Sequence, residues 1–418
     1  MQICVMGAGI AGLAAAWQLQ SEGHDVTIID RAGAGAGASG ANGAQLSYAY
    51  VQPLADPGIW AQLPGLLFSR NSPLTLRPRW DIDQWRWGAS FLAACRARVS
   101  RESTVQLLAL AADSRRAFER LLAEQAIECD FSATGKLVLY SDERSFAHAR
   151  RQLALQQGLG VQQRAANAAE CVEIEPALAG YQRNISGAIY TPGECAADCY
   201  KVCLELLRLL RARGARTIFD TEVGGLVMRS GRVAAVRTAA GLVEADAFVV
   251  ALGSASARLA RSQGLYLPVY PLKGYSLTLP ANDSAPRVNV TDAARKVVFA
   301  RIGQRLRIAG MAELVGDDLS IPATRTRNLA AAARDLFGDC GDLSQCEPWA
   351  GLRPATPTGL PVIGPHPKGP PNLVFNTGHG ALGFTLAFGS AQRVAALLRA
   401  PRAHRLRPAA ATPVPYSA

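Results

Sequence analysis

Glycines near the N-terminus are spaced as in a dinucleotide-binding turn. Gly7, Gly9 and Gly12 follow the apolar run 2–6 and open the apolar segment 10–20. In such a turn the first glycine allows a tight bend, the second lets the backbone approach a pyrophosphate, and the third lets the helix pack against the strand. We therefore expect a pyrophosphate to lie at the N-terminal end of this helix, where backbone N–H groups are free.

An acidic residue completes this signature. A second apolar run, 25–29, ends in Asp30, at the distance from Gly12 that one βαβ unit requires. A carboxylate there accepts hydrogen bonds from an adenosine ribose. The alternative is a glycine-rich surface turn followed by an unrelated aspartate, and the joint occurrence of strand, helix and acid argues against it.

Two glycine-rich segments near the C-terminus also carry chemistry. Arg353 lies in the segment 349–364, and its planar fork can bind a carboxylate through two hydrogen bonds. The alternative is an arginine that pairs with protein groups beside a cofactor. The segment 376–384 precedes a helix whose dipole would favour negative charge at its start. His379 within it is interpreted as a hydrogen-bonding loop residue rather than a base.

A family resemblance rests on four separated motifs. They are 351–364 (GLRPATPTGLPVIG), 376–384 (NTGHGALGF), 271–277 (PLKGYSL) and 310–313 (GMAE). Together they resemble the bacterial D-amino-acid dehydrogenase (small subunit) family, within the D-amino-acid oxidase and glycine oxidase superfamily. The resemblance covers nearly the whole chain. Phe384 stands where that family usually has tryptophan, which bears on the substrate side chain.

The resemblance implies a cofactor and a reaction. The cofactor is FAD, and it is non-covalent because 39–47 and 351–364 contain neither histidine nor cysteine. The reaction is oxidation of a D-amino acid by hydride transfer from Cα to flavin N5, with electrons passed to a respiratory, quinone-type acceptor. Alternatives are an enzyme for proline-like, hydroxyproline or sarcosine-like secondary amines, and a non-catalytic FAD-binding subunit of a membrane complex.

Fingerprint and resemblance together predict the site residues. Arg353 is the expected carboxylate anchor, with Tyr275, Tyr48 and Tyr50 as candidates for a second hydroxyl contact. We assign no general base, since hydride transfer from a neutral amine does not need one. The residues expected to contact FAD are Gly7, Gly9, Ile10, Ala11, Gly12, Asp30, Arg31, Ser39, Asn42, Gly43, Ala44, Gln45, Leu46, Val223, Gly253, Gly351, Arg353, Gly378, His379, Gly380, Leu382, Gly383, Phe384 and Thr385.

The composition narrows the protein class. The chain has 418 residues, 49% hydrophobic and 18% charged, which predicts a soluble protein too long for one core. Its net charge of +11 suits an anionic lipid or cofactor, and no Lys/Arg block interleaved with aromatics points to nucleic acid. Nine cysteines without a cleavable signal favour the cytoplasm. We interpret Cys195, Cys199 and Cys203, four apart on one expected helix face, as packing residues rather than metal ligands.

The order of apolar runs predicts an α/β fold. We expect an FAD-binding Rossmann-like domain of the glutathione-reductase type, interrupted by a mixed-sheet α+β substrate-binding domain. The expected ranges are 1–90, 193–261 and 345–418 for the first domain, and 91–192 and 262–344 for the second. Helices are expected over 103–126 and 200–213.

The segment 59–95 combines tryptophan with arginine. Trp80, Trp85 and Trp87 alternate there with Arg79 and other arginines, a composition that suits a membrane interface. The alternative is a helical region whose tryptophans pack on the core. Because no run reaches the ~18 apolar residues of a spanning helix, contact with an anionic membrane would be peripheral, at the inner face of the plasma membrane.

Overall fold

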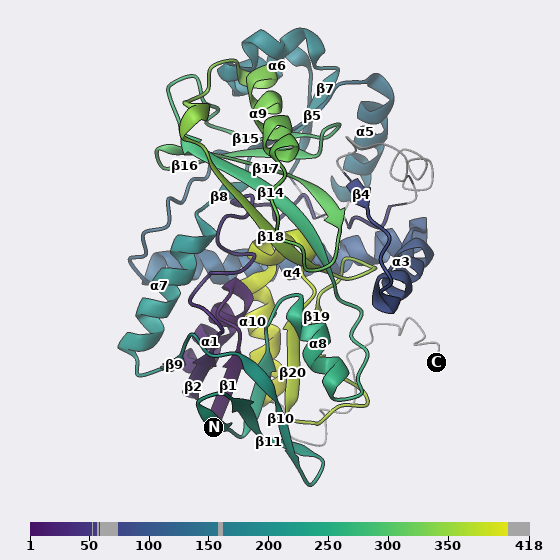
Figure 1. Ribbon diagram of the computed structural model, residues 1–418. Helices are drawn as coiled ribbons and strands as arrows, with labels where there is room; N and C mark the ends of the chain where they lie inside the picture. The colour runs from purple at the N-terminus through teal and green to yellow at the C-terminus, as the bar shows by residue number, and fades with distance from the viewer. Residues whose placement is uncertain (52, 57, 59–73, 158–161, 400–418) are drawn as a thin grey trace.

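A computed structural model describes the chain except residues 52, 57, 59–73, 158–161 and 400–418. Two large sheets organise it. In Figure 1 the sheet with the purple N-terminal strands lies in the lower half and a larger sheet lies above it. The sheets and their helices confirm the predicted α/β fold class.

The lower sheet is built on the N-terminal strand. β1 (Gln2–Met6) pairs in parallel with β2 (Asp25–Ile29) and β13 (Ala247–Val250), and α1 (Ile10–Ser21) connects β1 to β2. The six strands lie in the order β19-β20-β13-β1-β2-β9, and only β19 is antiparallel to its neighbour. The outer strands are β9 (Arg216–Ile218), β20 (Leu373–Thr377) and β19 (Val362–Pro365).

Four helices share the main core with this sheet. α10 (Gly383–Arg399) packs against α1 and α4 (Ala97–Glu124), and α7 (Cys199–Ala212) packs against α1. Their buried faces form one apolar cluster with β1 and β2. α4 and α7 correspond to the two helices predicted from leucine periodicity, with α4 beginning earlier than expected.

The upper sheet has nine strands and mixed directions. Its order is β18-β14-β17-β16-β15-β5-β7-β6, with β4 paired to β17. One face packs against α9 (Ala323–Phe337), since the buried cluster on that side joins this helix to strand residues. The strands are β18 (Glu347–Ala355), β14 (Tyr270–Pro280), β17 (Arg305–Leu314), β16 (Val297–Ile302), β15 (Asn289–Asp292), β5 (Lys136–Tyr140), β7 (Gly187–Thr191), β6 (Arg164–Ala166) and β4 (Leu74–Leu76).

Shorter elements complete the chain. A three-stranded sheet and a two-stranded pair lie beside the large sheets. They are β10 (Val223–Arg229), β11 (Arg232–Thr238) and β12 (Gly241–Glu244), and β3 (Gln45–Leu46) with β8 (Cys195–Ala196). The remaining helices are α3 (Ile82–Ala94), α5 (Glu143–Gln157), α6 (Ala168–Ile174), α8 (Ala255–Ser262), and the 3-10 turns η1 (Pro176–Asn184), η2 (Leu343–Gln345) and η3 (Gly380–Leu382).

Two elements pack differently from the predicted domain division. The range 91–192 assigns α4 to the substrate-binding domain, yet Leu107 and Phe118 of α4 are buried in the core of the lower sheet. The range 345–418 assigns β18 to the FAD-binding domain, yet β18 pairs with β14 along its whole length in the upper sheet. Both differences arise from partners distant in sequence. The division itself stays a prediction.

Cys195 also departs from its expected place. It lies in β8, and α7 begins only at Cys199, so the three cysteines do not share one helix. All three are buried, because β8 and α7 both pack into the main core.

Among the described residues, one helix has the length and apolarity to cross a membrane. It spans 380–399 with a mean hydropathy of 1.3, a run that inspection of the sequence alone overlooks. Most of it is α10, whose buried residues belong to the main core. Packing inside the protein accounts for its apolar character.

Phe118 joins α4 to α10, so we predict that Phe118→Ala destabilises the fold strongly. Its ring contacts Phe384 and Phe388 with centroid distances of 5.9 Å and 4.9 Å and is fully buried. Emptying this position should lower the free energy of unfolding by about 3–5 kcal/mol. Urea denaturation measures it. Val105→Ala, at an exposed position of the same helix, is the control and should change the value by about 0.5 kcal/mol or less. Equal losses in both variants would contradict this role.

Candidate active site

The N-terminal turn packs as the glycine spacing predicts. Gly7 has φ +109°, and a Cβ on it would overlap the Ala251 carbonyl, whose carbon lies 2.7 Å away. A Cβ on Gly12 would overlap the Gly7 carbonyl, whose carbon lies 2.9 Å away. Gly7 and Gly12 are therefore required by contacts within the protein itself.

Gly9 differs from these two glycines. The nearest atom to a Cβ built on Gly9 is the Ser39 hydroxyl oxygen at 3.5 Å, which is ordinary contact. The Ser39 hydroxyl accepts a hydrogen bond from the Ile10 N–H at 3.0 Å. α1 begins here with no acidic residue in its first turn. The uncrowded backbone at Gly9 and the positive end of α1 fit a pyrophosphate group.

Both carboxylate oxygens of Asp30, at the end of β2, accept hydrogen bonds from backbone N–H groups. One accepts a hydrogen bond from Ala8 N–H at 2.7 Å and the other from Ala32 N–H at 2.9 Å. Each carboxylate oxygen retains a further acceptor site for a ribose hydroxyl. The neighbouring Arg31 is exposed. The Thr221 N–H donates a hydrogen bond to the Asp30 carbonyl, and the predicted residue Val223 follows two positions later at the start of β10.

The segment 41–47 lies against the face of the upper sheet that is opposite to α9. The Ser276 hydroxyl donates to the Ala41 carbonyl at 2.7 Å, and Arg307 donates to the Asn42 carbonyl at 2.8 Å. The Gln45 amide then donates to carbonyls of β15 and β16. The predicted cofactor residues Asn42, Gly43, Ala44, Gln45 and Leu46 are thus held in one strip between the two sheets.

That strip also meets the start of α10. The Ser47 N–H donates to the Thr385 hydroxyl at 3.2 Å. Gly43 lies close to the sheet, since a Cβ on it would be 3.1 Å from Val298. The structure therefore brings 42–46 and Thr385, two predicted parts of the cofactor site, into one region.

Arg353 on β18 lies in the same region with its charge unopposed. Its Nη1 donates to the Met311 carbonyl at 2.7 Å. Burial lowers the pKa of Arg353 to about 10, and no carboxylate among the described residues acts to raise it. A half-buried guanidinium that is protonated at neutral pH and has no partner carboxylate among the described residues is suited to bind an anionic ligand.

The turn 378–380 connects Arg353 to the cofactor region. His379 pairs with Ala355, two residues after Arg353, and Gly378 and Gly380 have φ of +82° and +56°. Burial lowers the pKa of His379 to about 4, and its Nε2 lies 2.9 Å from the Ser390 hydroxyl. The imidazole is therefore neutral at physiological pH, and its interpretation as a hydrogen-bonding loop residue rather than a base stays a prediction.

Hydrogen bonds to the predicted residues Ala11 and Gly253 tie the end of β20, just before this turn, to α1 and to the segment after β13. The Asn376 side chain donates to the Ala11 carbonyl at 3.0 Å, and the Thr377 hydroxyl donates to the Gly253 carbonyl at 2.9 Å. Leu382 and Gly383 follow at the start of α10. The Phe384 ring packs on Phe118 in the core, so Phe384 is placed to meet a ligand only through its backbone.

Tyr275 does not lie where the sequence prediction places it. Its hydroxyl donates to Glu313 at 2.6 Å, and its ring is buried in the cluster that contains α9. Adjacent Gly274 faces Arg353, and successive residues of a strand point to opposite faces. Tyr275 therefore lies on the far face of the sheet from Arg353, because α9 covers that face.

Tyr48 and Tyr50 follow the strip, and Tyr48 is buried while Tyr50 is half-buried. The Arg115 guanidinium lies 5.7 Å from the Tyr48 ring centroid, and the Lys136 ammonium lies 4.4 Å from that of Tyr50. Lys136 also donates to the Ser47 hydroxyl at 2.8 Å, and burial lowers its pKa to about 8. Sequence reasoning misses Lys136, since a lysine in a short strand gives no signal of burial.

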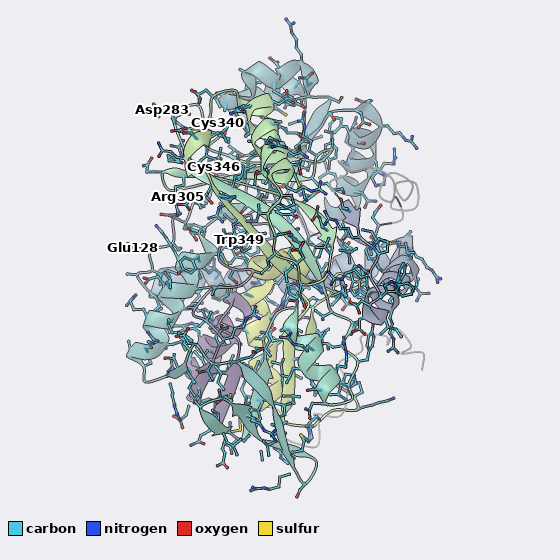
Figure 2. All side chains as sticks on the ribbon, viewed as in Figure 1. Glu128, Asp283, Arg305, Cys340, Cys346 and Trp349 are labelled. Atoms are coloured by element: carbon cyan, nitrogen blue, oxygen red, sulfur yellow. The ribbon has the colours of Figure 1, made fainter. Side chains whose placement is uncertain are left out.

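Gly274 and Gly351 lie directly opposite each other in the β14–β18 pairing. A Cβ on Gly274 would overlap the Arg353 guanidinium, with Nη1 at 2.6 Å, and one on Gly351 would overlap the indole of Trp349, with Cζ2 at 2.7 Å. Trp349, labelled in Figure 2, comes from the same strand as Arg353. Sequence reasoning also misses the contacts of Gly274 and Met311 with Arg353, although both residues lie in the quoted motifs.

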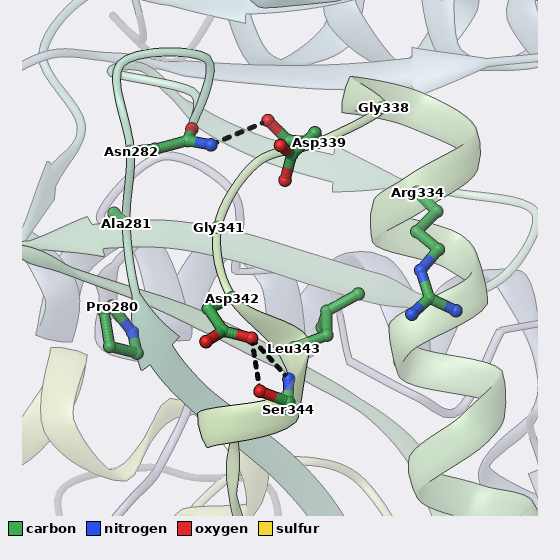
Figure 3. Close-up of a pocket in the computed structure, with 10 residues that line it drawn as sticks. All are labelled: Pro280, Ala281, Asn282, Arg334, Gly338, Asp339, Gly341, Asp342, Leu343 and Ser344. Atoms are coloured by element: carbon green, nitrogen blue, oxygen red, sulfur yellow. Dashed lines mark hydrogen bonds between the residues drawn. The ribbon is translucent and has the colours of Figure 1, made fainter.

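A large open hollow lies away from the residues described above. It has a volume of about 970 Å³ and is shown in Figure 3. Its lining residues are Pro280, Ala281, Asn282, Arg334, Gly338, Asp339, Gly341, Asp342, Leu343 and Ser344. They lie at the end of β14 remote from Gly274 and include none of the predicted site residues.

Comparison with known proteins agrees with this geometry. The family model described as FAD dependent oxidoreductase matches residues 2–397. The chain belongs to the FAD-dependent oxidoreductase family. It is 47% identical to D-amino acid dehydrogenase 2 of Ralstonia nicotianae, covering 96% of this chain and 97% of the relative. It is 46% identical to D-amino acid dehydrogenase 2 of Pseudomonas aeruginosa, covering 94% of both. The resemblance carried by the four motifs is thereby confirmed.

Solved structures of the same fold support the architecture. Glycine oxidase from Bacillus cereus matches with a TM-score of 0.74 and 20% identity over 95% of this chain and 94% of that one. L-proline dehydrogenase from P. horikoshii matches with a TM-score of 0.75 and 18% identity over 95% and 93%. At these identities the likeness concerns the fold alone.

FAD is the cofactor of this oxidoreductase, and the residues present fit it. The uncrowded backbone at Gly9 and the Asp30 carboxylate suit the pyrophosphate and the ribose. The strip 42–46 and the start of α10 would hold the remainder of the cofactor beside Arg353.

Gly9→Ala and Gly12→Ala should therefore separate cofactor binding from folding. Since the protein leaves room for a Cβ at position 9, Gly9→Ala should change the unfolding free energy of the apoprotein by about 0.5 kcal/mol or less. Its affinity for FAD should fall at least ~10-fold, because a methyl group would occupy the path of the phosphates. Gly12→Ala should destabilise the apoprotein itself. FAD titration and urea denaturation measure the two effects. Unchanged FAD affinity in Gly9→Ala would refute the assignment.

Proposed function

We propose that this oxidoreductase oxidises D-amino acids, with Arg353 as the anchor of the substrate carboxylate. The observation that carries the proposal is the half-buried Arg353 guanidinium, which bonds to the Met311 carbonyl and which no carboxylate of the described residues neutralises. The named activity of relatives that are 47% and 46% identical over nearly their whole length supports the substrate class.

The side chains around the site bind and orient rather than exchange protons. A bidentate contact with Arg353 would fix the carboxylate and leave the neighbouring Cα near the strip 42–46. The substrate amine would lose its ammonium proton to solvent before hydride transfer, and His379, which is neutral and bonded to Ser390, is assigned no part in that step. Bound FAD supplies the two-electron acceptor for the hydride from Cα.

Arg353→Ala should weaken substrate binding more than it affects the cofactor. Loss of two charge-assisted hydrogen bonds, each worth about 1.5–3 kcal/mol, predicts a fall of 100-fold or more in kcat/KM for D-amino acids. Arg353→Lys, which keeps the charge without the fork, should recover part of it. Anaerobic flavin reduction across a panel of D-, L- and N-alkylated amino acids gives the rates, and dithionite reduction checks the cofactor. Unchanged rates in Arg353→Ala would remove the anchor role, and reduction only by L- or secondary amino acids would refute the substrate class.

We further propose that electrons pass to a quinone-type respiratory acceptor while α3 contacts an anionic membrane at its cytoplasmic face. Residues at the start of α3 have high exposed fractions, 106% for Trp80, 81% for Ile82 and 54% for Trp85. Exposed arginines flank them at Arg77, Arg79 and Arg86. Exposed tryptophan beside arginine suits the headgroup region of a bilayer.

The opposite side of α3 packs on the strands of the site. Trp87 is buried, stacks on Phe91 with a centroid distance of 5.2 Å, and donates from its indole to the Ala355 carbonyl at 2.8 Å. For Trp87 the packing interpretation of the segment 59–95 therefore holds. Residues 59–73 lie outside the described part of the chain. A membrane on the outer face of α3 would be one helix away from β18.

Replacing Trp80, Ile82 and Trp85 together by serine should abolish binding to vesicles. Flotation with liposomes rich in phosphatidylglycerol measures binding, and we expect the bound fraction to fall at least ~10-fold while turnover with a water-soluble acceptor is unchanged. The control replaces three exposed apolar residues on other surfaces, Leu204, Met228 and Leu242, by serine and should bind like the native protein. Failure of the native protein to bind these vesicles would sink the membrane proposal.

A further inference from the structure

The Arg353 side chain lies on a part of the sheet that has no side chains of its own. Gly274 of β14 and Gly351 of β18 are directly paired. The guanidinium of Arg353 occupies the space over Gly274, and the Trp349 indole occupies the space over Gly351. Two side chains of one strand therefore rest on a flat floor of backbone.

Glycine is the only residue type at position 274 that leaves the Arg353 guanidinium in this place. A Cβ at position 274 would lie 2.6 Å from Nη1 and would also overlap Cζ and Nη2. All the nearest atoms belong to the charged head of Arg353 and none to backbone. Any larger residue must therefore displace the guanidinium itself rather than strain the strand.

A bulge in β17 supplies the other contact of Arg353. Lys273 pairs with Glu313 while Tyr275 pairs with Gly310, so β17 has one more residue than β14 between these pairs. Met311 lies in the bulge with φ +62°, a conformation that non-glycine residues rarely adopt. Its carbonyl accepts the hydrogen bond from Arg353 Nη1 at 2.7 Å. The positive φ at Met311 thus accompanies a carbonyl that accepts a hydrogen bond from the guanidinium.

We propose that Gly274 and Met311 are positioning residues that fix the plane of the Arg353 guanidinium and thereby set the preference between enantiomers. The inference rests on the proposed function of Arg353 as carboxylate anchor. D- and L-amino acids present the same carboxylate, amine and α-hydrogen, and they differ only in how these are arranged about Cα. When the carboxylate plane is fixed, one enantiomer alone can direct its α-hydrogen at the acceptor with its side chain unobstructed. A guanidinium free to tilt accepts both more equally.

Gly274→Ala tests the floor, with Gly180→Ala as its matched control. Gly180 has open space around its Cα and lies far from the site, in η1. In the FAD-loaded enzyme we expect Gly274→Ala to raise the Kd for propionate, a carboxylate without an amine, at least 10-fold in calorimetric titration. The ratio of flavin reduction rates for D- and L-alanine should fall at least 5-fold. The FAD Kd should stay within 2-fold, and Gly180→Ala should match the native protein throughout.

A pair of variants at Met311 tests the bulge independently, including the case in which Gly274→Ala fails to fold. Met311→Gly keeps access to positive φ and loses a buried side chain, so it should lower the melting temperature while the propionate Kd stays within 3-fold. Met311→Val keeps an apolar side chain but resists positive φ, so it should raise the propionate Kd at least 10-fold.

Three results would overturn the inference. They are a propionate Kd unchanged in Gly274→Ala, an equal Kd in the two Met311 variants, and an enantiomer ratio that stays constant while the Kd rises. Failure of the proposed function has a different signature. If the native enzyme is reduced by no D-amino acid of the panel, yet Gly274→Ala still weakens propionate binding, then the substrate class is wrong and the positioning of Arg353 stands.

Discussion

A half-buried cation, Arg353, with no partner carboxylate among the described residues constrains the rest of this structure. Removing the Arg353 guanidinium from water is unfavourable by several kcal/mol unless hydrogen bonds and a counter-charge compensate. The fold supplies one carbonyl, from Met311, and no carboxylate among the described residues. An anionic ligand bound there would supply the missing counter-charge and would gain affinity from it.

The two sheets are joined where that charge lies. β18 belongs to the upper sheet, and its end pairs with His379 at Ala355, in the turn between β20 and α10. α10 packs on α1, which carries the glycine turn. Any displacement of β18 would therefore move the carboxylate anchor and the start of α10 together. With Arg353 as the proposed anchor, this connection would keep the substrate and the cofactor in one rigid relation, which hydride transfer between fixed atoms requires.

Features that depend on neighbouring residues can be predicted from the sequence, whereas features that depend on partners remote in the chain cannot. The Gly7–Gly12 turn and Asp30 are predictable because the strand, turn, helix and acidic residue of one βαβ unit follow each other directly in the sequence, although Gly7 also packs on the remote Ala251. The burial of α4, the place of β18 and the face on which Tyr275 lies all depend on α9, α10 or β14, which are remote in the chain. Cys195 falls in β8 for the same reason, since its pairing partner is Leu46. Local periodicity carries no information on such partners.

The atoms around each glycine show whether packing within the protein requires the absence of a side chain. At Gly7 and Gly12 a Cβ would overlap backbone, and at Gly274 it would overlap one charged side chain, whereas at Gly9 it would meet nothing closer than 3.5 Å. A motif reports only that a glycine is present, so all four look alike in sequence. The atoms that would meet the missing Cβ identify the reason for each. Of Gly7, Gly9 and Gly12, Gly9 alone leaves room for a Cβ within the protein, so we propose that its lack of a side chain serves the approach of FAD rather than packing within the fold.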